Sequence, residues 1–340
     1  MTPKERFGCL MSGKLPDRVP VICNLFEQGA AELGMPLKEY YSRGEFVAEG
    51  QLKLAEKFGY DNLWAFHHTA IDAEMLGSRY TAYSEEGPPN VGDLVLHSES
   101  DIYKLKVTED ILDTKAHHEV AKTLKILKEE KGDSYPVLGA VVGSYSMPAI
   151  LIGMERWMEL LYFSSDKAAR TLMEKCSEFC RIKTKALIDE GADMIVYMNP
   201  LASASFISVN KFRSDALEWI KRDSEGTGSN MVYFNGGGQI NPMITPLLEE
   251  TDFPFIYINP LDDAAEAKSL IDGKRNLVGT INDIKLISQN SEEIIDEVDR
   301  IVKAGKPGGG FAFGTLVMPM AIKEEKIKLM INRVKETGRY

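Results

Sequence analysis

Short apolar runs alternate with longer amphipathic segments along nearly the whole chain. The runs are rich in Val, Ile, Tyr and Phe and show little alternation of apolar and polar residues, which is typical of strands buried on both faces. Eight such runs occur, at residues 19–24, 61–66, 136–142, 194–199, 231–235, 255–259, 276–281 and 310–315. The pattern therefore predicts eight buried strands.

The segments between the runs have the spacing and the ends expected of helices. Apolar residues recur at helical spacing over 46–59 and 166–191, and each segment ends near a glycine suited to a helix C-cap. Residues 291–305 begin with Ser291 and acidic residues and end in Lys-Ala-Gly, as a helix does. Strand and helix repeated eight times predict an α/β fold of the (β/α)8 TIM barrel type. The alternative is a doubly wound open sheet, which is weaker because no G-x-G-x-x-G motif follows the first strand.

Residues 78–135 interrupt this repeat. Their first part reads as a loop or a small hairpin, and a charged helix is expected near 114–131. We interpret the segment as an insertion after the second strand of one barrel domain spanning 1–340, since no long linker, low-complexity tract or internal repeat is visible.

Composition and charge exclude several classes of protein. The chain of 340 residues is 44% hydrophobic and 27% charged, as ordinary globular proteins are. Its net charge of −11, with no basic stripe, argues against a nucleic-acid partner. No apolar run approaches the roughly 20 residues of a membrane span, and the N-terminus lacks the apolar core of a signal peptide. The four cysteines show no disulfide spacing, so we expect a cytoplasmic protein, with Cys176 and Cys180 packed in the core.

In a TIM barrel the active site lies at the C-terminal ends of the strands, so the residues that end the runs are the candidates. Asparagine ends four of the eight runs, and Asn282 directly follows a fifth. A ring of amides predicts a polar, largely uncharged pocket, although asparagine also favours turns that follow strands. The candidates are Cys23 and Asn24, His67 and His68, Gly143 to Tyr145, Asn199, Asn235, Asn259, Asn282 with Asp283, and Gly314 with Thr315.

Three groups among or beside these candidates suggest particular chemistry. Histidine suits proton transfer near neutral pH or metal ligation. Because His67 and His68 are adjacent, we expect one to point into the barrel mouth and the other into packing. The glycine-rich 235–238 segment after the fifth strand suits close approach of a ligand. Met318 and Met320, after the last strand, suit either the wall of an apolar pocket or simple packing.

Several blocks of the sequence resemble the uroporphyrinogen decarboxylase superfamily. They are "MTPKERF…GKLPDRVPV", "GADMIVYMNPLASASFISVNKF", "NLVGTINDIKLI", "SEEIIDEVDRIVKAG" and "GGGFAFGT…P", in the right order over nearly the whole chain. The resemblance implies a TIM barrel that is often dimeric. It also implies one of two functions, which are porphyrinogen decarboxylation and methyl transfer to or from a protein-bound corrinoid.

The residues that serve the decarboxylases differ in this chain. The first strand of those enzymes is followed by an arginine-rich segment of the "RQAGRY" type, whereas this chain has "CNLFEQGAAELG", with Glu27 and no arginine. Their aspartate at the end of the second strand falls at about His68. An acidic mouth without arginine disfavours a substrate with many carboxylates.

The thiol-dependent methyltransferases of this superfamily carry a zinc site built from a His-x-Cys motif after strand five and a further cysteine after strand eight. Alignment on "VYFNG" puts Tyr233 in place of the histidine and Asn235 in place of the cysteine, and "GTLVMPMA" has no cysteine. The resemblance therefore implies that the usual zinc centre is missing. Zinc held through Cys23, Glu27 or a histidine is left open as an alternative.

A member without this zinc is expected to move a methyl group from a small donor to cob(I)alamin on a partner corrinoid protein. We predict the donor-specific component of an O-demethylase that acts on a methoxylated aromatic. The alternatives are a decarboxylase or lyase acting on another substrate, and a non-catalytic ligand-binding barrel. The expected catalytic residues are His67, His68, Tyr233 and Asn235. The expected substrate-binding residues are Asn24, Glu27, Tyr145, Asn199, Asn282, Met318 and Met320.

Overall fold

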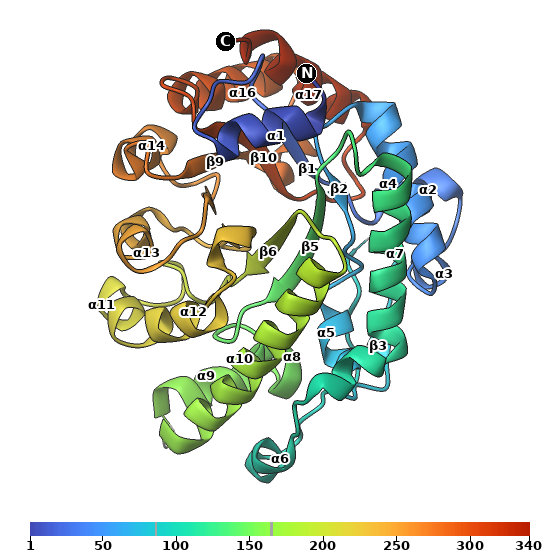
Figure 1. Cartoon of the computed structure of the whole chain (residues 1–340), viewed down its shortest axis with the longest axis vertical. Helices are drawn as coiled ribbons and strands as arrows, with labels where there is room; N and C mark the ends of the chain where they lie inside the picture. Colours follow the sequence, from blue (N-terminus) through green and yellow to red (C-terminus); the bar gives the residue numbers. More distant parts are fainter. Residues whose placement is uncertain (86, 164–165) are drawn as a thin grey trace.

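Eight parallel strands form a nearly closed barrel inside a layer of helices in the computed structural model of the chain (Figure 1). The structure describes residues 1–85, 87–163 and 166–340. The strands are hydrogen-bonded in the order β1-β10-β9-β8-β7-β6-β5-β2. Each predicted run overlaps one strand, so the predicted TIM barrel is confirmed. The strands are β1 (Val21–Asn24), β2 (Leu63–Trp64), β5 (Val137–Val142), β6 (Met194–Met198), β7 (Met231–Phe234), β8 (Phe255–Tyr257), β9 (Asn276–Ile281) and β10 (Phe311–Val317).

One principal helix follows each barrel strand and covers the outside of the ring. The predicted helices at 46–59, 166–191 and 291–305 correspond to α4, α10 and α16. Gly59, with φ of 68°, forms the left-handed C-cap of α4, and Asn290 forms a capping box at the start of α16. The principal helices are α4 (Gly44–Phe58), α7 (Lys115–Lys131), α10 (Asp166–Asp189), α12 (Leu217–Asp223), α13 (Ile244–Glu250), α14 (Ala264–Ile271), α16 (Ser291–Gly305) and α17 (Glu324–Thr337).

Residues 78–135 contain a small hairpin and then return to the barrel pattern. The antiparallel strands β3 (Thr81–Ala82) and β4 (Asn90–Val91) form the hairpin. Helix α6 (Glu99–Lys104) and the 3-10 turn η1 (Glu109–Asp113) follow it. Helix α7 then takes the place of the barrel's own helix between β2 and β5, beside α4 (Figure 1). The structure added to the barrel therefore lies before α7.

Short helices make up the remaining connections. None of the helices in the described ranges is long and apolar enough to cross a membrane. The α-helices are α2 (Gln28–Leu33), α3 (Leu37–Tyr40), α5 (Ala70–Met75), α8 (Pro148–Ile152), α9 (Met154–Phe163), α11 (Val209–Lys211) and α15 (Asp283–Leu286). The π-helical η2 (Phe212–Ala216) and the 3-10 turns η3 (Gly228–Asn230) and η4 (Asn241–Met243) complete the set.

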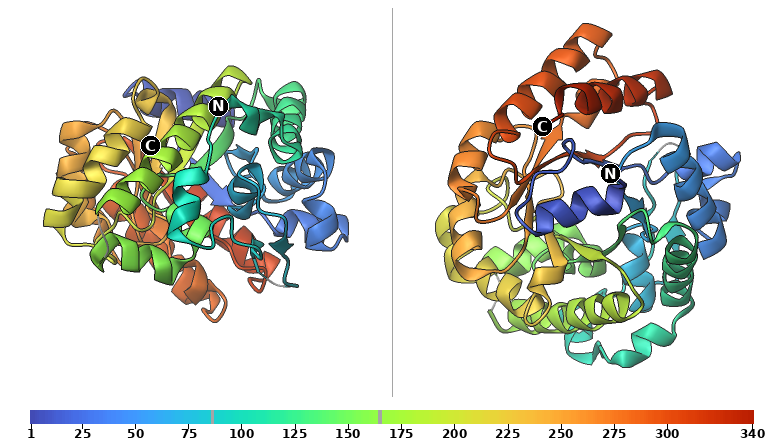
Figure 2. Two further views of the ribbon diagram at one scale, coloured as in Figure 1. Left: turned by 90° about the horizontal axis from the view of Figure 1, so that it is seen from below. Right: turned by 45° about the horizontal axis from the view of Figure 1, so that its top comes forward.

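The N-terminal helix α1 (Pro3–Met11) crosses the middle of the ring (Figure 2). The ring of Phe7 stacks on that of Phe255, with centroids 5.0 Å apart, and Leu10 belongs to the cluster inside the barrel. Because Phe255 is the first residue of β8, α1 covers the N-terminal ends of the strands. The C-terminal ends are therefore where a ligand has access, as in other TIM barrels.

Side chains alternate along each strand between the barrel interior and the outer helices. On β7, Val232 and Phe234 belong to the interior cluster, whereas Met231 and Tyr233 belong to the outer core. On β2 and the residues after it, Trp64 and Phe66 face inward while Leu63 faces outward. The same alternation decides which of two neighbouring strand-end residues faces the mouth.

Backbone and side-chain hydrogen bonds, rather than a strand ladder, join β1 to β2 and complete the ring. The Asp61 amide donates to the Val21 carbonyl at 2.7 Å. The Cys23 amide donates to Asn62 Oδ1, and Trp64 Nε1 donates to the Cys23 carbonyl, both at 2.9 Å. These bonds fix the end of β1, from which the first residues of the candidate site project.

Candidate active site at the mouth of the barrel

A chamber of about 160 Å³ lies inside the barrel at the C-terminal ends of the strands. Four of its lining residues are Phe or Trp, and its polar lining side chains are those of Asn24, Glu27, His68 and Thr69. We call it the inner chamber. Its remaining lining residues are Phe26, Trp64, Phe66, Pro88, Ala140, Val196, Met198, Phe234 and Val317.

A wider groove of about 430 Å³ continues the inner chamber outward. The two spaces share Thr69, Met198, Phe234 and Val317, so they form one continuous site. We call the wider part the outer groove. Its other lining residues are Val142, Ser146, Ala149, Ile150, Met154, Pro200, Leu201, Gly236, Asp283, Ile284 and Leu316. Its outer edge is apolar and open to solvent, since Met154 is 48% and Ile284 63% exposed.

Glu27 is the acidic group of the inner chamber. Its side chain is 3% exposed, and burial raises its pKa. The Tyr41 hydroxyl, just after α3, donates a hydrogen bond to Glu27 Oε1 at 3.2 Å. That bond favours the ionised form, but burial has the larger effect and favours the protonated form. A buried carboxyl with a raised pKa is a candidate general acid.

The two adjacent histidines point in different directions. His68 lines the inner chamber, whereas His67 Nε2 is hydrogen-bonded to Thr123 Oγ1 on α7 at 2.9 Å, outside the barrel. Burial lowers the pKa of His67 to about 4. Burial, with smaller contributions from His67 and Lys183, lowers the pKa of His68 to about 3. His68 is therefore a neutral imidazole at pH 7. It can donate or accept a hydrogen bond, but it carries no positive charge.

Asn24 faces the inner chamber with an unused acceptor. Its Nδ2 donates to the Thr315 carbonyl at 2.7 Å, and its backbone amide donates to Thr315 Oγ1 at 2.9 Å. Because a carbonyl can only accept, the first bond fixes which amide atom is nitrogen. The remaining atom, Oδ1, is buried and has no hydrogen-bond partner among the described residues.

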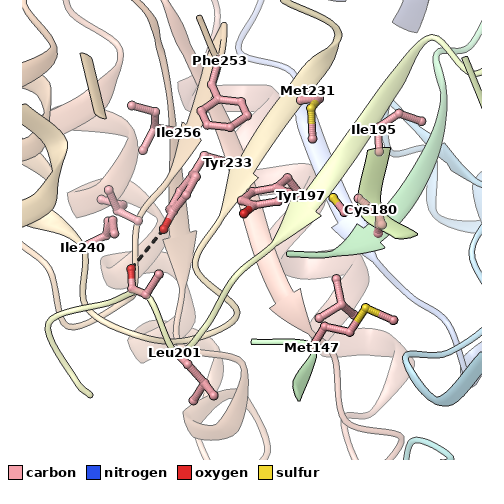
Figure 3. Close-up of a cluster of buried hydrophobic side chains, with 14 of the residues drawn as sticks. Met147, Cys180, Ile195, Tyr197, Leu201, Met231, Tyr233, Ile240, Phe253 and Ile256 are labelled. Atoms are coloured by element: carbon pink, nitrogen blue, oxygen red, sulfur yellow. Dashed lines mark hydrogen bonds between the residues drawn. The ribbon is translucent and has the colours of Figure 1, made fainter. Parts of the chain in front are cut away.

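Tyr233 does not reach the chamber. It lies on the outer side of β7 with Tyr197 and Phe253, and its hydroxyl donates to the Ala202 carbonyl at 3.1 Å (Figure 3). The phenol is buried and its pKa is raised by that burial. Its surroundings are those of a core tyrosine whose hydroxyl is satisfied.

We expect Tyr233→Phe to affect stability and leave catalytic activity unchanged. Loss of the bond to Ala202 should lower the free energy of unfolding by about 0.5–1.5 kcal/mol. Urea denaturation and the turnover rate, measured on the same preparation, check this. A large fall in rate with intact folding would instead restore Tyr233 to the catalytic group.

Asn235 and the glycines after it form a tight turn. Asn235 Nδ2 donates to the Gly238 carbonyl, and Gly236 and Gly237 have φ values of 57° and 95°, where glycine is favoured. A Cβ on Gly238 would lie 2.1 Å from Ser203 Oγ. These glycines are required by the turn itself. Gly236 alone of them lines the outer groove.

Tyr145 and Asn199 are engaged in a buried polar network beside the site. The Tyr145 hydroxyl donates to Asp215 Oδ2 at 3.2 Å. Asn199 Nδ2 donates to the Tyr197 hydroxyl at 3.0 Å, and Asn199 Oδ1 accepts from the Ser146 hydroxyl at 2.6 Å. The structure therefore brings neither side chain to the inner chamber, although Ser146 lines the outer groove.

The remaining predicted residues lie around the site rather than in it. Asn282 caps α15 by accepting from the Lys285 amide at 3.0 Å. Met318 is buried in the outer core, and its carbonyl accepts from Gln28 Nε2 at 2.6 Å. Met320 packs on a small cluster that includes Tyr41. The two methionines thus support the loop after β10 and the tyrosine that contacts Glu27.

Asp283 is a strand-end candidate to which the sequence assigns no particular chemistry. It lines the outer groove at the start of α15. Burial raises its pKa to about 6 against the effect of two backbone amides that favour its ionised form. A carboxyl with this pKa beside an apolar groove is a functional candidate.

Because the pKa of Asp283 is raised, the free energy of unfolding should fall as the pH rises through about 6. Its pKa in the folded chain exceeds the value of about 3.9 in an unfolded one, so the folded state binds the proton more tightly. This contribution is present below the unfolded pKa and is lost as the pH rises through the folded pKa. Asp283→Asn should therefore gain stability relative to the natural chain at pH 7.5 but not at pH 4, as urea midpoints would show. An equal difference at both pH values would contradict this assignment.

Tyr233 and Asn235, which the resemblance places at the positions of the zinc motif, do not fit a zinc ion. Tyr233 lies outside the barrel and Asn235 is bound within its own turn. Cys23 also faces the outer core, where burial raises its pKa, and so points away from Glu27 in the chamber. Over 1–85, 87–163 and 166–340, no three His, Cys, Asp or Glu side chains are grouped to hold a metal ion. Cys176 and Cys180 are buried in the core, as expected.

Comparison with known proteins identifies a matching family and several similar methyltransferases. The family described as "Uroporphyrinogen decarboxylase (URO-D)" matches residues 2–337. The methylcobamide:CoM methyltransferase MtbA of Methanosarcina mazei is 27% identical over 226 residues, 65% of each chain. MtbA of Methanosarcina acetivorans is 24% identical over 311 residues, 88% of each chain. MtaA of Methanosarcina barkeri is 24% identical over 285 residues, 83% of each chain.

Solved structures confirm the fold. A methyltransferase from Methanosarcina mazei superposes with a TM-score of 0.85 at 20% identity over 99% of each chain. A B12-independent methionine synthase from Shewanella sp. W3-18-1 has a TM-score of 0.56 at 12% identity over 88% of each chain. At these identities the likeness establishes the barrel and not the substrate.

Proposed function

The chain belongs to the uroporphyrinogen decarboxylase (URO-D) family, and from this premise we propose that it transfers a methyl group from a small methoxylated aromatic to cob(I)alamin on a partner corrinoid protein. The curated relatives are methylcobamide:CoM methyltransferases, which supports corrinoid-dependent methyl transfer as the reaction class. The single observation that carries the choice of donor is the inner chamber. It combines aromatic walls with one buried carboxyl.

The walls of the inner chamber suit a single aromatic ring. Phe26 packs edge-on against Trp64 and Phe66, with ring centroids 5.3 and 5.0 Å apart. Aromatic rings favour such edge and offset contacts with one another. A volume of about 160 Å³ is smaller than the roughly 300–1,000 Å³ of pockets for drug-sized ligands. A small ring with one or two substituents therefore matches the chamber in shape and in chemistry.

Glu27 supplies the proton that demethylation of an ether requires. The bond between the methyl carbon and the ether oxygen breaks as the methyl group passes to cob(I)alamin. The oxygen keeps the bonding electron pair, and the Glu27 carboxyl provides the proton that makes the product a neutral phenol. Tyr41, bonded to Glu27 Oε1 at 3.2 Å, orients the carboxyl and stabilises the carboxylate that remains. His68, neutral at pH 7, offers a second hydrogen bond to the donor.

The outer groove is the side from which the corrinoid would approach. Cobalamin is the partner's cargo and acts here as a co-substrate. An open apolar edge beside the inner chamber, formed by Met154, Ile284 and Val317, offers a contact surface for the corrin macrocycle. These residues would hold the corrinoid against the methyl group while excluding water.

Two other activities are compatible with the family. Decarboxylation of a porphyrinogen is disfavoured because no Arg or Lys lines either part of the described site to bind the carboxylates. Transfer from methylcobamide to a thiol, as in the names of the relatives, is favoured by their similarity. Such thiol transfer lacks support from Tyr233 and Asn235, which the resemblance places where the ligands of the thiol-activating zinc would be.

Anaerobic incubation with cob(I)alamin and a panel of methoxylated aromatics tests this proposal. We expect the absorbance of methylcobalamin to appear together with an equal amount of demethylated phenol, and only when the protein is present. The panel should also include methylamines and thioethers. If no donor yields methylcobalamin above the rate without protein, with free cobalamin or a purified corrinoid protein, the proposal fails.

A further inference from the structure

Asn24 has a feature that catalysis as described does not use. Its Oδ1 is buried, lacks a partner and belongs to a side chain that lines the inner chamber. Its Nδ2 is held on the Thr315 carbonyl at 2.7 Å, so the amide cannot turn to satisfy Oδ1 elsewhere. An unsatisfied buried acceptor destabilises the empty site. A ligand that donates a hydrogen bond to Oδ1 removes that destabilisation, whereas a ligand without a donor does not.

The charges around the inner chamber restrict the ligand further. Glu27 is the one ionisable acid among its described lining residues, and no Lys or Arg accompanies it. The buried cation Lys183 lowers the pKa of His68, but its Nζ is already paired with Asp72. A carboxylate on the ligand would enter a dry aromatic space beside a second carboxyl and without a cation. Burial of an unpaired charge of this kind is strongly unfavourable.

We propose that Asn24 is the specificity-determining residue of the site and selects an uncharged methoxyphenol, whose free hydroxyl donates to Asn24 Oδ1. The inference rests on the proposed function, because it concerns the methyl donor of the same chamber. It adds two requirements, a hydroxyl beside the methoxy group and the absence of a carboxylate. A permanently charged methylammonium is the main rival, since aromatic walls and a carboxyl also suit such cations. It has no N–H for Asn24 Oδ1, however.

Binding measured without any corrinoid tests the inference separately from the reaction. Trp64 lies in the chamber wall, so quenching of tryptophan fluorescence reports occupancy, and calorimetry gives the affinity independently. The probes are 2-methoxyphenol, methoxybenzene, 3-methoxybenzoate and tetramethylammonium. We expect 2-methoxyphenol to bind at least about tenfold more tightly than methoxybenzene, the effect of satisfying one buried acceptor. We expect no measurable binding of 3-methoxybenzoate or tetramethylammonium.

Two variants locate the effect. Asn24→Leu should reduce the affinity for 2-methoxyphenol to that for methoxybenzene while leaving the latter unchanged. Asn282→Ala, which removes another strand-end asparagine that caps α15 outside the chamber, should leave the ratio of the two affinities as in the natural chain. If Asn24→Leu fails to fold, the four probes on the natural chain still decide the question.

Each contrary result overturns the inference in a different way. Equal affinity for 2-methoxyphenol and methoxybenzene removes the role of Asn24 Oδ1. Tight binding of 3-methoxybenzoate removes the exclusion of carboxylates, and tight binding of tetramethylammonium replaces the phenol with a cationic donor. In all three cases methylcobalamin formation from another ether would leave the proposed function standing. Absence of methylcobalamin despite selective binding of 2-methoxyphenol would instead refute the function and leave the selectivity.

Discussion

Replacing Glu27 by glutamine should lower the rate of methyl transfer by about 10²–10⁴-fold, the usual contribution of a positioned general acid. Glutamine keeps the size and the hydrogen-bonding capacity of the side chain, and its carbonyl oxygen can still accept from the Tyr41 hydroxyl. It cannot release a proton to the ether oxygen. Donor affinity should therefore change little while turnover falls, and single-turnover formation of methylcobalamin measures the second quantity directly.

Two further variants test whether the loss of rate in Glu27→Gln comes from the loss of an acid. Glu27→Asp retains an acid and should recover part of the activity, whereas Tyr41→Phe should reduce the rate less than Glu27→Gln because the acid is only misoriented. A donor with a better leaving group, such as a nitro-substituted methoxyphenol, needs less help from an acid and should be less sensitive to Glu27→Gln. Equal rates for Glu27→Gln and the natural chain would contradict the role of Glu27 as a proton donor.

Lys183→Met should lower the free energy of unfolding by about 3–5 kcal/mol, the typical cost of removing one partner from a buried ion pair. Lys183 on α10 binds Asp72 on α5, and their side chains are only 1% and 2% exposed. Asp72 Oδ2 also accepts from the Val142 amide at the end of β5, at 3.2 Å. Without the lysine, the Asp72 carboxylate would be buried and unpaired at the junction of three elements. Urea denaturation at neutral pH measures the loss.

The same helix offers a matched control for this variant. Lys185, two residues further along α10, is exposed, and Lys185→Met should leave the unfolding midpoint nearly unchanged. Replacing both partners, as Asp72→Leu with Lys183→Met, should recover much of the lost stability, because no unpaired charge remains. A Lys183→Met chain as stable as the Lys185→Met control would show that the buried pair contributes nothing.

The strands and the principal helices could be predicted from the sequence because burial on both faces leaves a distinctive pattern. Runs such as 231–235 and 276–281 are continuous and apolar, and the helix at 291–305 carries its own caps. The bounds of the second strand are harder to predict, because only Leu63 and Trp64 of the run at 61–66 pair with a neighbouring strand. In this region side-chain bonds from Asn62 and Trp64 replace the ladder between β1 and β2.

The direction of individual side chains was the harder part of the site. The period of two along a strand places Asn24 and His68 inside while their neighbours Cys23 and His67 face the outer core. The sequence shows the alternation, but only packing decides which of the two alternating sets of side chains faces the barrel interior. Alternation alone would have placed Tyr233 outside once Phe234 was known to face inward.

Some contributions to the site carry no local signal at all. Tyr41 reaches Glu27 from the end of a short helix fourteen residues away, and no spacing rule indicates that contact. The raised pKa of Asp283 comes from burial beside the outer groove, which depends on the folded rim. The asparagines at the strand ends have different structural roles. Asn24 faces the inner chamber, Asn235 stabilises a turn and Asn282 caps a helix.

The direction of methyl transfer is the central claim, and two parallel anaerobic assays on one preparation test it most directly. One contains cob(I)alamin and 2-methoxyphenol, and the other contains methylcobalamin and CoM, the thiol in the names of the relatives. From the proposed function we expect methylcobalamin formation with release of the demethylated phenol in the first assay, and no reaction above the protein-free rate in the second. Demethylation of methylcobalamin by CoM, with no transfer from the ether, would contradict it.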